Sequence, residues 1–335
     1  MSSTVSGFKP RHLVSMLELE KNELINLIDR AQYFKNLIKS NQLPPNNLDQ
    51  ALKGKTSALL FTKRSTRTRI SSEGAVVYFG GHPFFLNQND IQLGVNESLL
   101  DTVKVLSSMT SCIFARVNSH NDIQELCKYS SVPVINSLCD TFHPLQSIAD
   151  LLTIKEQFSD LYDPVEKSFK GKLKLTWIGD ANNVINDLSI ACLKFGINVS
   201  VVLPKNIQFN NDIYLKGKEI SKENNVKFEI LNDPVIGCLN SNILVTDTFV
   251  SMGEEDSKLE KLKKFENLQI NSNLVKSSKV NSNWIFMHCL PRHKEEVSDE
   301  VFYSDNSVVF QEAENRLYAA ISAIEGFVIN KGKLV

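Results

Sequence analysis

The chain has 335 residues, of which 42% are hydrophobic and 22% are charged, a composition typical of a globular protein with about two domains. Its 37 basic and 38 acidic residues give a formal net charge of −1, which argues against a broad nucleic-acid or membrane surface because such surfaces need a basic excess. The six cysteines are scattered without a C-x-x-C pair, which argues against a disulfide framework or a zinc site and suits a reducing compartment.

The N-terminal part of the chain predicts a long helix, a buried strand and a second helix that begins in a basic turn. Apolar residues recur at helical spacing over residues 17–37. The short apolar run at 56–61 predicts a buried strand. After this strand, Ser65 or Thr66 can cap a helix that ends near the glycine pair at 80–81.

The second part of the chain alternates strands with helices. A helix is expected at 184–195, and apolar runs predict strands at 174–179, 198–204, 226–231, 242–247 and 284–291. This alternation implies βαβ units and a parallel sheet, in which ligands bind at the carboxyl ends of the strands. Polar side chains follow three of the expected strands, namely Asp180, Asn182, Asn183, Asp247, His288 and Cys289.

The predicted fold class is α/β, with two domains that each contain a central, mainly parallel sheet flanked by helices. A connecting helix is expected at 142–158. We place the first domain at residues 1–155 and the second at 156–310. The last segment, 311–335, predicts an amphipathic helix that packs back on the first domain.

The stretch FTKRSTRTRIS concentrates four cations, Lys63, Arg64, Arg67 and Arg69, in a chain with no net positive charge. Backbone N–H groups and the helix dipole at the start of the expected helix favour an anion such as a phosphate group. The interleaved hydroxyl groups add donors, and an arginine can bind two oxygens at once. A solvated basic turn or a nucleic-acid patch is the alternative interpretation.

Three weaker candidate sites each have an ordinary structural alternative. His143 and Gln146 are spaced to share a face at a helix start, where they can hydrogen-bond a carbonyl or amide, or His143 only caps the helix. Asp247 at a strand end suits an ammonium group, or it is an N-cap. Cys289 precedes a Leu-Pro bond that can be cis, and it is either a catalytic thiol or a small buried hydrophobe.

Six blocks occur in an order that resembles the ornithine carbamoyltransferases, especially the fungal enzymes: STRTR, FHPLQ, GDANNV, DTFVSMG, HCLPR and EAENRLYA. The resemblance covers nearly the whole chain from about Arg11 onward. STRTR and HPLQ alone mark the wider carbamoyltransferase family, whereas DTFVSMG with HCLP points to ornithine. The resemblance implies transfer of the carbamoyl group of carbamoyl phosphate to the δ-amino group of L-ornithine, which gives L-citrulline and phosphate in arginine biosynthesis.

The resemblance also implies roles for individual residues, with carbamoyl phosphate bound by the first domain and ornithine by the second. The phosphate group would be bound by Ser65, Thr66, Arg67, Thr68 and Arg116. The carbamoyl group would be bound by His143 and Gln146, with support from Arg316. Ornithine would be bound by Asn183, Asp247, Ser251, Met252, Cys289 and Leu290. Cys289 would accept the proton of the δ-amino group, while Arg67, Arg116 and His143 stabilise charge on the carbamoyl oxygen.

Two other classes of protein remain open. A nicotinamide-dependent oxidoreductase would carry a G-x-G-x-x-G turn where this chain has WIGDANNV. A non-catalytic relative would bind the same metabolites for regulation, although every expected catalytic position is filled here. Within the family, putrescine, acetylornithine and aspartate are alternative acceptors, of which Asp247 disfavours the dicarboxylate.

The expected partners are carbamoyl phosphate, L-ornithine and two further copies of the chain, because Gln92 lies in a loop that reaches the neighbouring subunit's site in the family's homotrimers. No nucleic acid and no membrane is expected, since no stretch approaches the ~18 consecutive apolar residues of a membrane helix. The resemblance implies neither a cofactor nor a metal. The segment before Arg11 is short for a transit peptide, so the expected location is cytoplasmic, with the mitochondrial matrix as the alternative.

Overall fold

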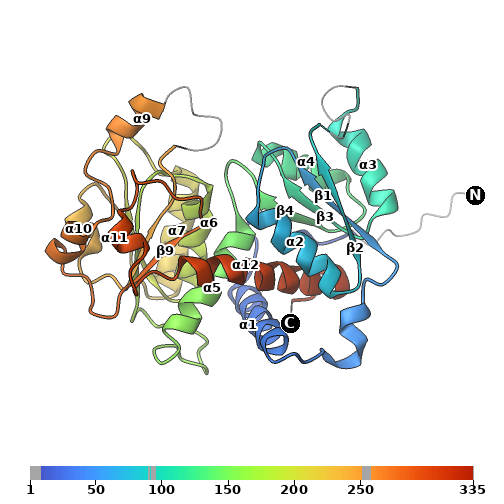
Figure 1. Cartoon of the computed structure of the whole chain (residues 1–335), viewed down its shortest axis with the longest axis horizontal. Helices are drawn as coiled ribbons and strands as arrows, with labels where there is room; N and C mark the ends of the chain where they lie inside the picture. The colour runs from blue at the N-terminus through green and yellow to red at the C-terminus, as the bar shows by residue number, and fades with distance from the viewer. Residues whose placement is uncertain (1–8, 90, 92–95, 251–257, 335) are drawn as a thin grey trace, which may run out of the picture. The chain divides into compact units, whose positions relative to one another are not determined.

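The computed structural model describes residues 9–89, 91, 96–250 and 258–334 of the chain. It divides into two compact units, drawn in Figure 1. The first unit runs up to Leu145 and resumes at Arg316, and the second unit is the continuous segment Gln146–Asn315. The boundaries predicted at 155/156 and 310/311 concern functional domains and stay a prediction.

The first unit contains a four-stranded parallel sheet in the order β2-β1-β3-β4. Its strands are β1 (Thr56–Phe61), β2 (His82–Asn87), β3 (Ile113–Arg116) and β4 (Val134–Leu138). Its helices are α1 (Lys21–Lys39), η1 (Pro45–Gln50), α2 (Arg67–Tyr78), α3 (Leu99–Met109), α4 (His120–Tyr129) and the π-helical η3 (Ile324–Ile329).

The second unit contains a five-stranded parallel sheet in the order β7-β6-β5-β8-β9. Its strands are β5 (Lys174–Ile178), β6 (Asn198–Val202), β7 (Phe228–Leu231), β8 (Ile243–Thr246) and β9 (Ile285–His288). Its helices are α6 (Asn183–Lys194), α7 (Asn211–Glu223), α8 (Pro234–Cys238), α9 (Lys258–Lys264), α10 (Ser272–Ser277) and α11 (Asp299–Phe302). Two further helices, α5 (Pro144–Gln157) and α12 (Val309–Ala323), carry the chain across the unit boundaries.

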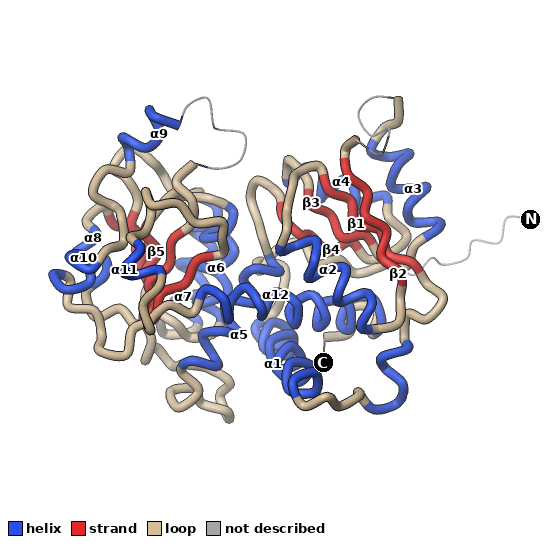
Figure 2. The backbone as a smooth tube through the Cα atoms, in the orientation of Figure 1, coloured by secondary structure: helices blue, strands red, loops and turns tan. Residues whose placement is uncertain are grey.

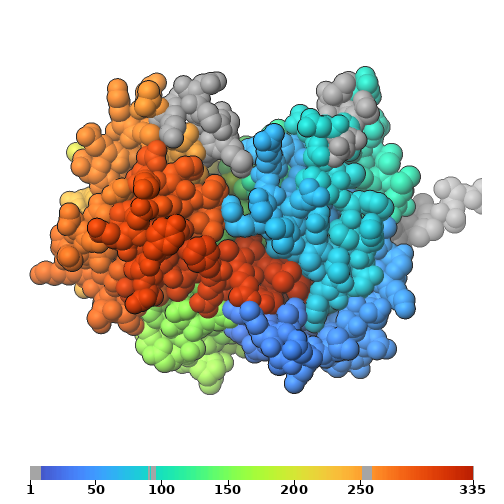
Figure 3. Space-filling view, viewed as in Figure 1, coloured from blue at the N-terminus to red at the C-terminus, as the bar shows by residue number. Residues whose placement is uncertain are grey.

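Helices cover both faces of each sheet, and strands and helices can be followed in Figure 2. In the first unit, α2 joins β1 to β2 in one direction and α3 joins β2 to β3 in the other, so right-handed crossovers place these two helices on opposite faces. In the second unit, α6 packs beside α7 and α8 packs beside α10. In Figure 3 the visible face of the second unit consists largely of its later, orange segments.

The inner strands of each sheet are buried because both faces of the sheet are covered, whereas the edge strands β2 and β7 are partly exposed. All four residues of β3, β8 and β9 are buried, and Trp177 of β5 has no exposed surface. Burial of one large apolar side chain stabilises the folded state by about 1.5–3 kcal/mol. The indole Nε1 of Trp177 donates to the carbonyl of Asp180 at 2.9 Å, so its polar atom is satisfied within the core.

The predicted fold class is confirmed, and each predicted strand is present in the structure. The predicted helix after the basic turn is α2, and it ends two residues before Gly80, whose φ of +75° suits glycine. Thr66 is the N-cap by position, but its side chain makes no capping bond; the hydroxyl of Ser65 instead accepts from the N–H of Thr68 at 3.2 Å. Among the described residues, no helix is long and apolar enough to cross a membrane.

The structure places His143 directly before the connecting helix. α5 begins at Pro144, so His143 occupies the position of a helix cap, and its predicted shared face with Gln146 stays a prediction. His143 belongs to the first unit and Gln146 begins the second. The chain changes units inside the first turn of α5, a position that helical periodicity alone cannot reveal.

Each sheet has one point where the strand order reverses. In the first sheet, β2 lies on one side of β1 and β3 lies on the other. In the second sheet, β6 and β7 lie on one side of β5, and β8 and β9 lie on the other. Ligand sites of parallel sheets lie at the carboxyl ends of the strands beside such a reversal. A ligand site is therefore expected after β1 and β3 and after β5 and β8, and the ends of the neighbouring strands β4 and β9 lie at the same sheet edges.

Candidate functional site

The carboxyl ends of β1, β3 and β4 carry a cationic cluster in the first unit. The basic turn after β1 leads into α2, which starts with Arg67 and Thr68. Arg116 is the last residue of β3, and His143 follows β4. Arg316 enters from α12, where its Nη2 donates to the hydroxyl of Thr68 at 3.0 Å across 248 residues of sequence. Five of the predicted site residues are thus positioned on one unit.

The imidazole of His143 is acted on by the charges of the three arginines of this cluster. Burial lowers the pKa of His143 well below its ordinary value, and the charges of Arg316, Arg116 and Arg67 lower it further. His143 is therefore neutral at pH 7 and can exchange hydrogen bonds with a neutral group. Three guanidinium groups around one neutral ring leave a net positive site, which suits an anion with several oxygens.

The start of α2 adds backbone donors to this positive site. The helix spans 12 residues, and its first N–H groups and its dipole favour an anion at this end. A cation at the first helical position interacts unfavourably with the helix dipole, so Arg67 does not stabilise α2 from this position. The ligand-binding role predicted for Arg67 accounts for a cation at this position and stays a prediction.

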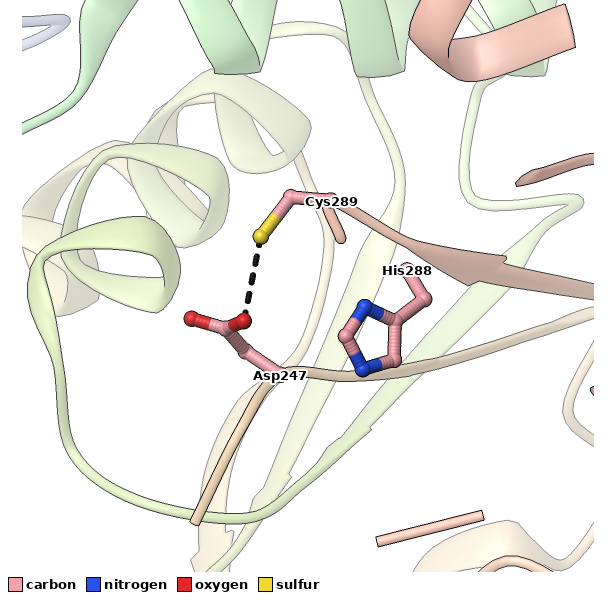
Figure 4. A group of neighbouring side chains, drawn as sticks. All are labelled: Asp247, His288 and Cys289. Carbon is pink, nitrogen blue, oxygen red and sulfur yellow. Dashed lines mark hydrogen bonds between the residues drawn. The ribbon is translucent and has the colours of Figure 1, made fainter. Parts of the chain in front are cut away.

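The carboxyl ends of β5, β8 and β9 carry a second cluster, and its centre is Asp247. The carboxylate follows β8 and is 8% exposed. Asn182 follows β5, caps α6 through its Oδ1, and donates from Nδ2 to Oδ2 of Asp247 at 2.9 Å. The Sγ of Cys289, which follows β9, donates to Oδ1 of Asp247 at 3.1 Å (Figure 4). Each carboxylate oxygen is therefore held by a neighbouring strand end.

The thiol of Cys289 is held in its protonated form. Burial raises the pKa of Cys289 well above its ordinary value, and the carboxylates of Asp247, Glu312 and Asp150 raise it further. At neutral pH the thiol keeps its proton and donates a hydrogen bond to Asp247. The role of proton acceptor implied for Cys289 stays a prediction. It requires the thiolate, which the raised pKa disfavours.

His288 is a buried residue of the second cluster that the sequence interpretation did not assign a role. Its Nδ1 accepts from the backbone N–H of Leu290 at 2.9 Å, so Nε2 carries the hydrogen that points at Oε1 of Glu296, 3.2 Å away. Leu290 has a φ of +61°, and the Leu290–Pro291 bond is cis, as the sequence allowed. The imidazole thus fixes the backbone that presents Leu290.

Asp247, His288 and Cys289 also place three donor atoms of metal-ligand type within 4.8 Å of one another (Figure 4). Both ring nitrogens of His288 already bond within the chain, and the thiol and the carboxylate bond to each other. A metal ion would have to displace these hydrogen bonds. The cluster is therefore not a preformed metal site.

The remaining predicted residues are placed as follows. Gln146 is buried in α5 and donates to Asp150 at 2.8 Å and to Glu312 at 3.1 Å. Asn183 is the first residue of α6. Gln92, Ser251 and Met252 lie outside the described residues. The sequence interpretation placed Asn182 after an expected strand without assigning it a role, and it missed Glu296 and Glu312, for which the sequence carried no signal.

Two family models match this chain, and between them they cover most of it. The model for the "Aspartate/ornithine carbamoyltransferase, carbamoyl-P binding domain" matches residues 11–156. The model for the "Aspartate/ornithine carbamoyltransferase, Asp/Orn binding domain" matches residues 171–325. The cationic cluster's positions up to His143 fall in the first match, and the cluster around Asp247 falls in the second.

Individual relatives agree with the family models. The chain is 60% identical to an "Ornithine transcarbamylase, mitochondrial" of Pachysolen tannophilus over 98% of this chain and 92% of the relative. It is 59% identical to an "Ornithine carbamoyltransferase" of Saccharomyces cerevisiae over 99% of this chain and 98% of the relative. A crystal structure of a mitochondrial ornithine carbamoyltransferase from Coccidioides immitis superposes with a TM-score of 0.89 at 49% identity, covering 97% of this chain and 100% of that chain. The chain therefore belongs to the aspartate/ornithine carbamoyltransferase family.

Proposed function

We propose that this chain is an ornithine carbamoyltransferase, which transfers the carbamoyl group of carbamoyl phosphate to the δ-amino group of L-ornithine. The products are L-citrulline and phosphate, and the reaction serves arginine biosynthesis. The observation that carries the proposal is the pair of opposite clusters, three arginines around a neutral histidine in one unit and an anchored carboxylate in the other. An anionic substrate and an ammonium-bearing substrate match these two charges.

Carbamoyl phosphate is assigned to the first cluster. Its phosphate group would be bound by the donors at the start of α2 and by the arginines, that is by Ser65, Thr66, Arg67, Thr68 and Arg116. The neutral His143 would donate to or accept from the carbamoyl group, which a charged imidazolium would do less selectively. Gln146 would bind the same group, with Arg316 in support.

Ornithine is assigned to the second cluster, where Asp247 would bind the α-ammonium group. The other proposed contacts of ornithine are Asn183, Ser251, Met252, Cys289 and Leu290. The δ-amino group has a pKa near the ~10.4 of lysine, so it first releases one proton to solvent; after it attacks, its nitrogen releases a second proton, which the departing phosphate takes up. The attack forms a C–N bond at the carbamoyl carbon, the negative charge that develops on the carbamoyl oxygen is stabilised by Arg67, Arg116 and His143, and the C–O bond to phosphate breaks.

The proposal is tested by incubating the purified protein with carbamoyl phosphate and four separate acceptors: ornithine, putrescine, acetylornithine and aspartate. We expect a ureido product with ornithine alone. Product formation with another acceptor would correct the substrate. A folded protein that binds carbamoyl phosphate and is inactive with all four acceptors would instead be a non-catalytic relative.

Replacement of Cys289 by serine is expected to lower kcat/KM for ornithine several-fold and to leave the shape of its pH profile unchanged between about pH 6 and pH 9. The thiol pKa is raised, so the thiol does not ionise in this range and the substitution removes no base; the serine hydroxyl is still a donor but reaches less far towards Asp247 than the thiol does. The measurement is kcat/KM for ornithine against pH for both proteins. A displaced rising limb in the serine variant would instead identify Cys289 as the proton acceptor.

The proposed assembly is a homotrimer in which Gln92 reaches the neighbouring subunit's site. Its support in the structure is a set of exposed apolar side chains on helix α2 and the adjacent edge strand β2: Ile70, Val77 and Phe84. Ile70 and Val77 are seven residues apart on α2, so they share one face of the helix. Exposed apolar groups gathered on neighbouring elements are typical of a subunit interface.

We expect Val77→Asp to shift the protein from trimer towards monomer, because an interface that buries Val77 would have to bury an unpaired carboxylate in the variant. Sedimentation velocity measures the assembly state. The matched control is Val165→Asp in the second unit, where the valine is 89% exposed. Val77 would not lie in the interface if both variants sediment as trimers.

The cytoplasmic location stays a prediction. The relatives from Pachysolen tannophilus and Coccidioides immitis are named mitochondrial, which supports the alternative location in the mitochondrial matrix. Cell fractionation of the native protein distinguishes the two. The proposed reaction requires no cofactor and no metal.

A further inference from the structure

Glu312 lies between residues of both proposed substrate sites. It is on α12, is 1% exposed, and belongs with its partners to the second unit. Its Oε1 accepts from Nε2 of Gln146 at 3.1 Å, and its Oε2 accepts from the backbone N–H of His288 at 2.8 Å. We propose, on the basis of the proposed function, that Glu312 is a positioning residue that fixes Gln146 for the carbamoyl group and the end of β9 for ornithine.

The contact with Gln146 determines which way its amide points. Nε2 of Gln146 donates to Oδ1 of Asp150 at 2.8 Å as well as to Glu312, so both amide hydrogens point at carboxylates. A flipped amide would place its oxygen against two carboxylates and would be repelled. Gln146 therefore presents its oxygen as a hydrogen-bond acceptor. This oxygen matches an N–H donor such as the nitrogen of the carbamoyl group.

The contact with His288 fixes the end of β9. His288 is the last residue of this strand, and the next residue is Cys289, which donates to Asp247. The imidazole of His288 is held by Glu296 on one side, and its backbone N–H is held by Glu312 on the other. The direction of the Cys289 side chain therefore depends on a backbone that Glu312 restrains.

A carboxylate at this depth carries a desolvation cost, and a well-packed apolar side chain would serve the packing of two helices at least as well. Other polar contacts already join α5 to α12. Asn315 donates to Thr153 at 2.8 Å, and Gln311 donates to Glu156 at 2.7 Å and accepts from Gln157 at 2.7 Å. A role in helix packing thus has other residues to perform it, whereas both site contacts depend on Glu312.

Glu312→Gln tests the inference because it keeps the shape and offers one acceptor oxygen in place of two. We expect kcat/KM to fall about tenfold or more for carbamoyl phosphate and also for ornithine, because one of the two charge-assisted bonds is lost whichever way the new amide lies. We also expect faster alkylation of Cys289 by iodoacetamide, measured by peptide mass spectrometry with Cys127 as the internal standard. Removal of a nearby negative charge favours the thiolate, and loss of a backbone restraint lets the reagent reach the sulfur more easily.

Gln311→Ala is the matched control, since it breaks contacts between α5 and α12 one residue away and touches neither site. We expect its two kcat/KM values to stay within about twofold of the unchanged protein and its Cys289 alkylation to be unchanged, because neither bond that it loses involves a residue of either site. Equal losses in both variants, a loss confined to one substrate in Glu312→Gln, or unchanged Cys289 alkylation would each overturn the inference. If the unchanged protein makes no citrulline while Glu312→Gln still accelerates alkylation, the proposed function fails and the restraint on Cys289 stands.

Discussion

The Arg67→Ala variant is expected to lose about a thousandfold or more in kcat/KM for carbamoyl phosphate. Arg67 starts α2 at the carboxyl end of β1, and its charge acts on His143 in the same cluster. Its guanidinium group can bind two phosphate oxygens and stabilises negative charge that increases as phosphate leaves. Both the affinity and the turnover should fall, which a steady-state assay at saturating ornithine measures.

The fold of this variant should be unaffected. Alanine is the best helix former, and removal of a cation from a helix start is favourable to the helix dipole. Arg69→Ala is the matched control, because Arg69 lies two residues further along α2, pairs with Glu73 at 2.9 Å and stacks over Phe85. We expect near-normal kinetics for Arg69→Ala. Near-normal kinetics for Arg67→Ala as well would remove the cationic turn from the proposed phosphate site.

The Asp247→Asn variant is expected to lose about a hundredfold or more in kcat/KM for ornithine, because a buried charge-assisted contact to an ammonium group is worth several kcal/mol. The carboxylate is nearly buried, and its two oxygens accept from Asn182 and Cys289. An amide in its place carries no charge and turns one N–H group towards a donor. The loss should be specific to ornithine, so the Kd for carbamoyl phosphate from calorimetry should stay within about twofold.

Asp180→Asn is the matched control for this substitution. Asp180 follows β5, on the neighbouring strand end, and pairs with Lys261 at 2.7 Å. We expect ornithine kinetics to change little in this variant. If Asp180→Asn and Asp247→Asn have similar effects, the general negative potential of this sheet edge, rather than the carboxylate of Asp247, attracts the substrate.

Much of the fold could be predicted from local sequence because the inner strands of parallel sheets are buried on both faces. The run at 56–61 consists mainly of apolar residues, and it is β1 without a shift at either end. The positions of Arg67, Asp247 and Cys289 could also be predicted, since a residue that follows such a strand lies at the ligand-binding edge of the sheet. These inferences need only chain order and strand burial.

The partners of these residues could not be predicted, because they depend on which segments tertiary packing brings together. Glu312 meets Gln146 across 166 residues and His288 across 24 residues, and no periodicity relates these positions. The protonated state of Cys289 likewise depends on burial and on three carboxylates from separate elements. The sequence shows a cysteine after a strand, whereas its chemistry is determined by the surrounding charges.

The division of the chain into units has a consequence for its synthesis on the ribosome. The second unit is continuous in sequence, whereas the first needs the last twenty residues to close its core: Arg30 binds Glu325 through two hydrogen bonds, and Thr68 accepts from Arg316. These contacts cannot form until Arg316 and Glu325 have been translated and have left the exit tunnel. The half of the protein that is translated first is therefore the half that matures last, and until then its unfinished core has to be protected from aggregation.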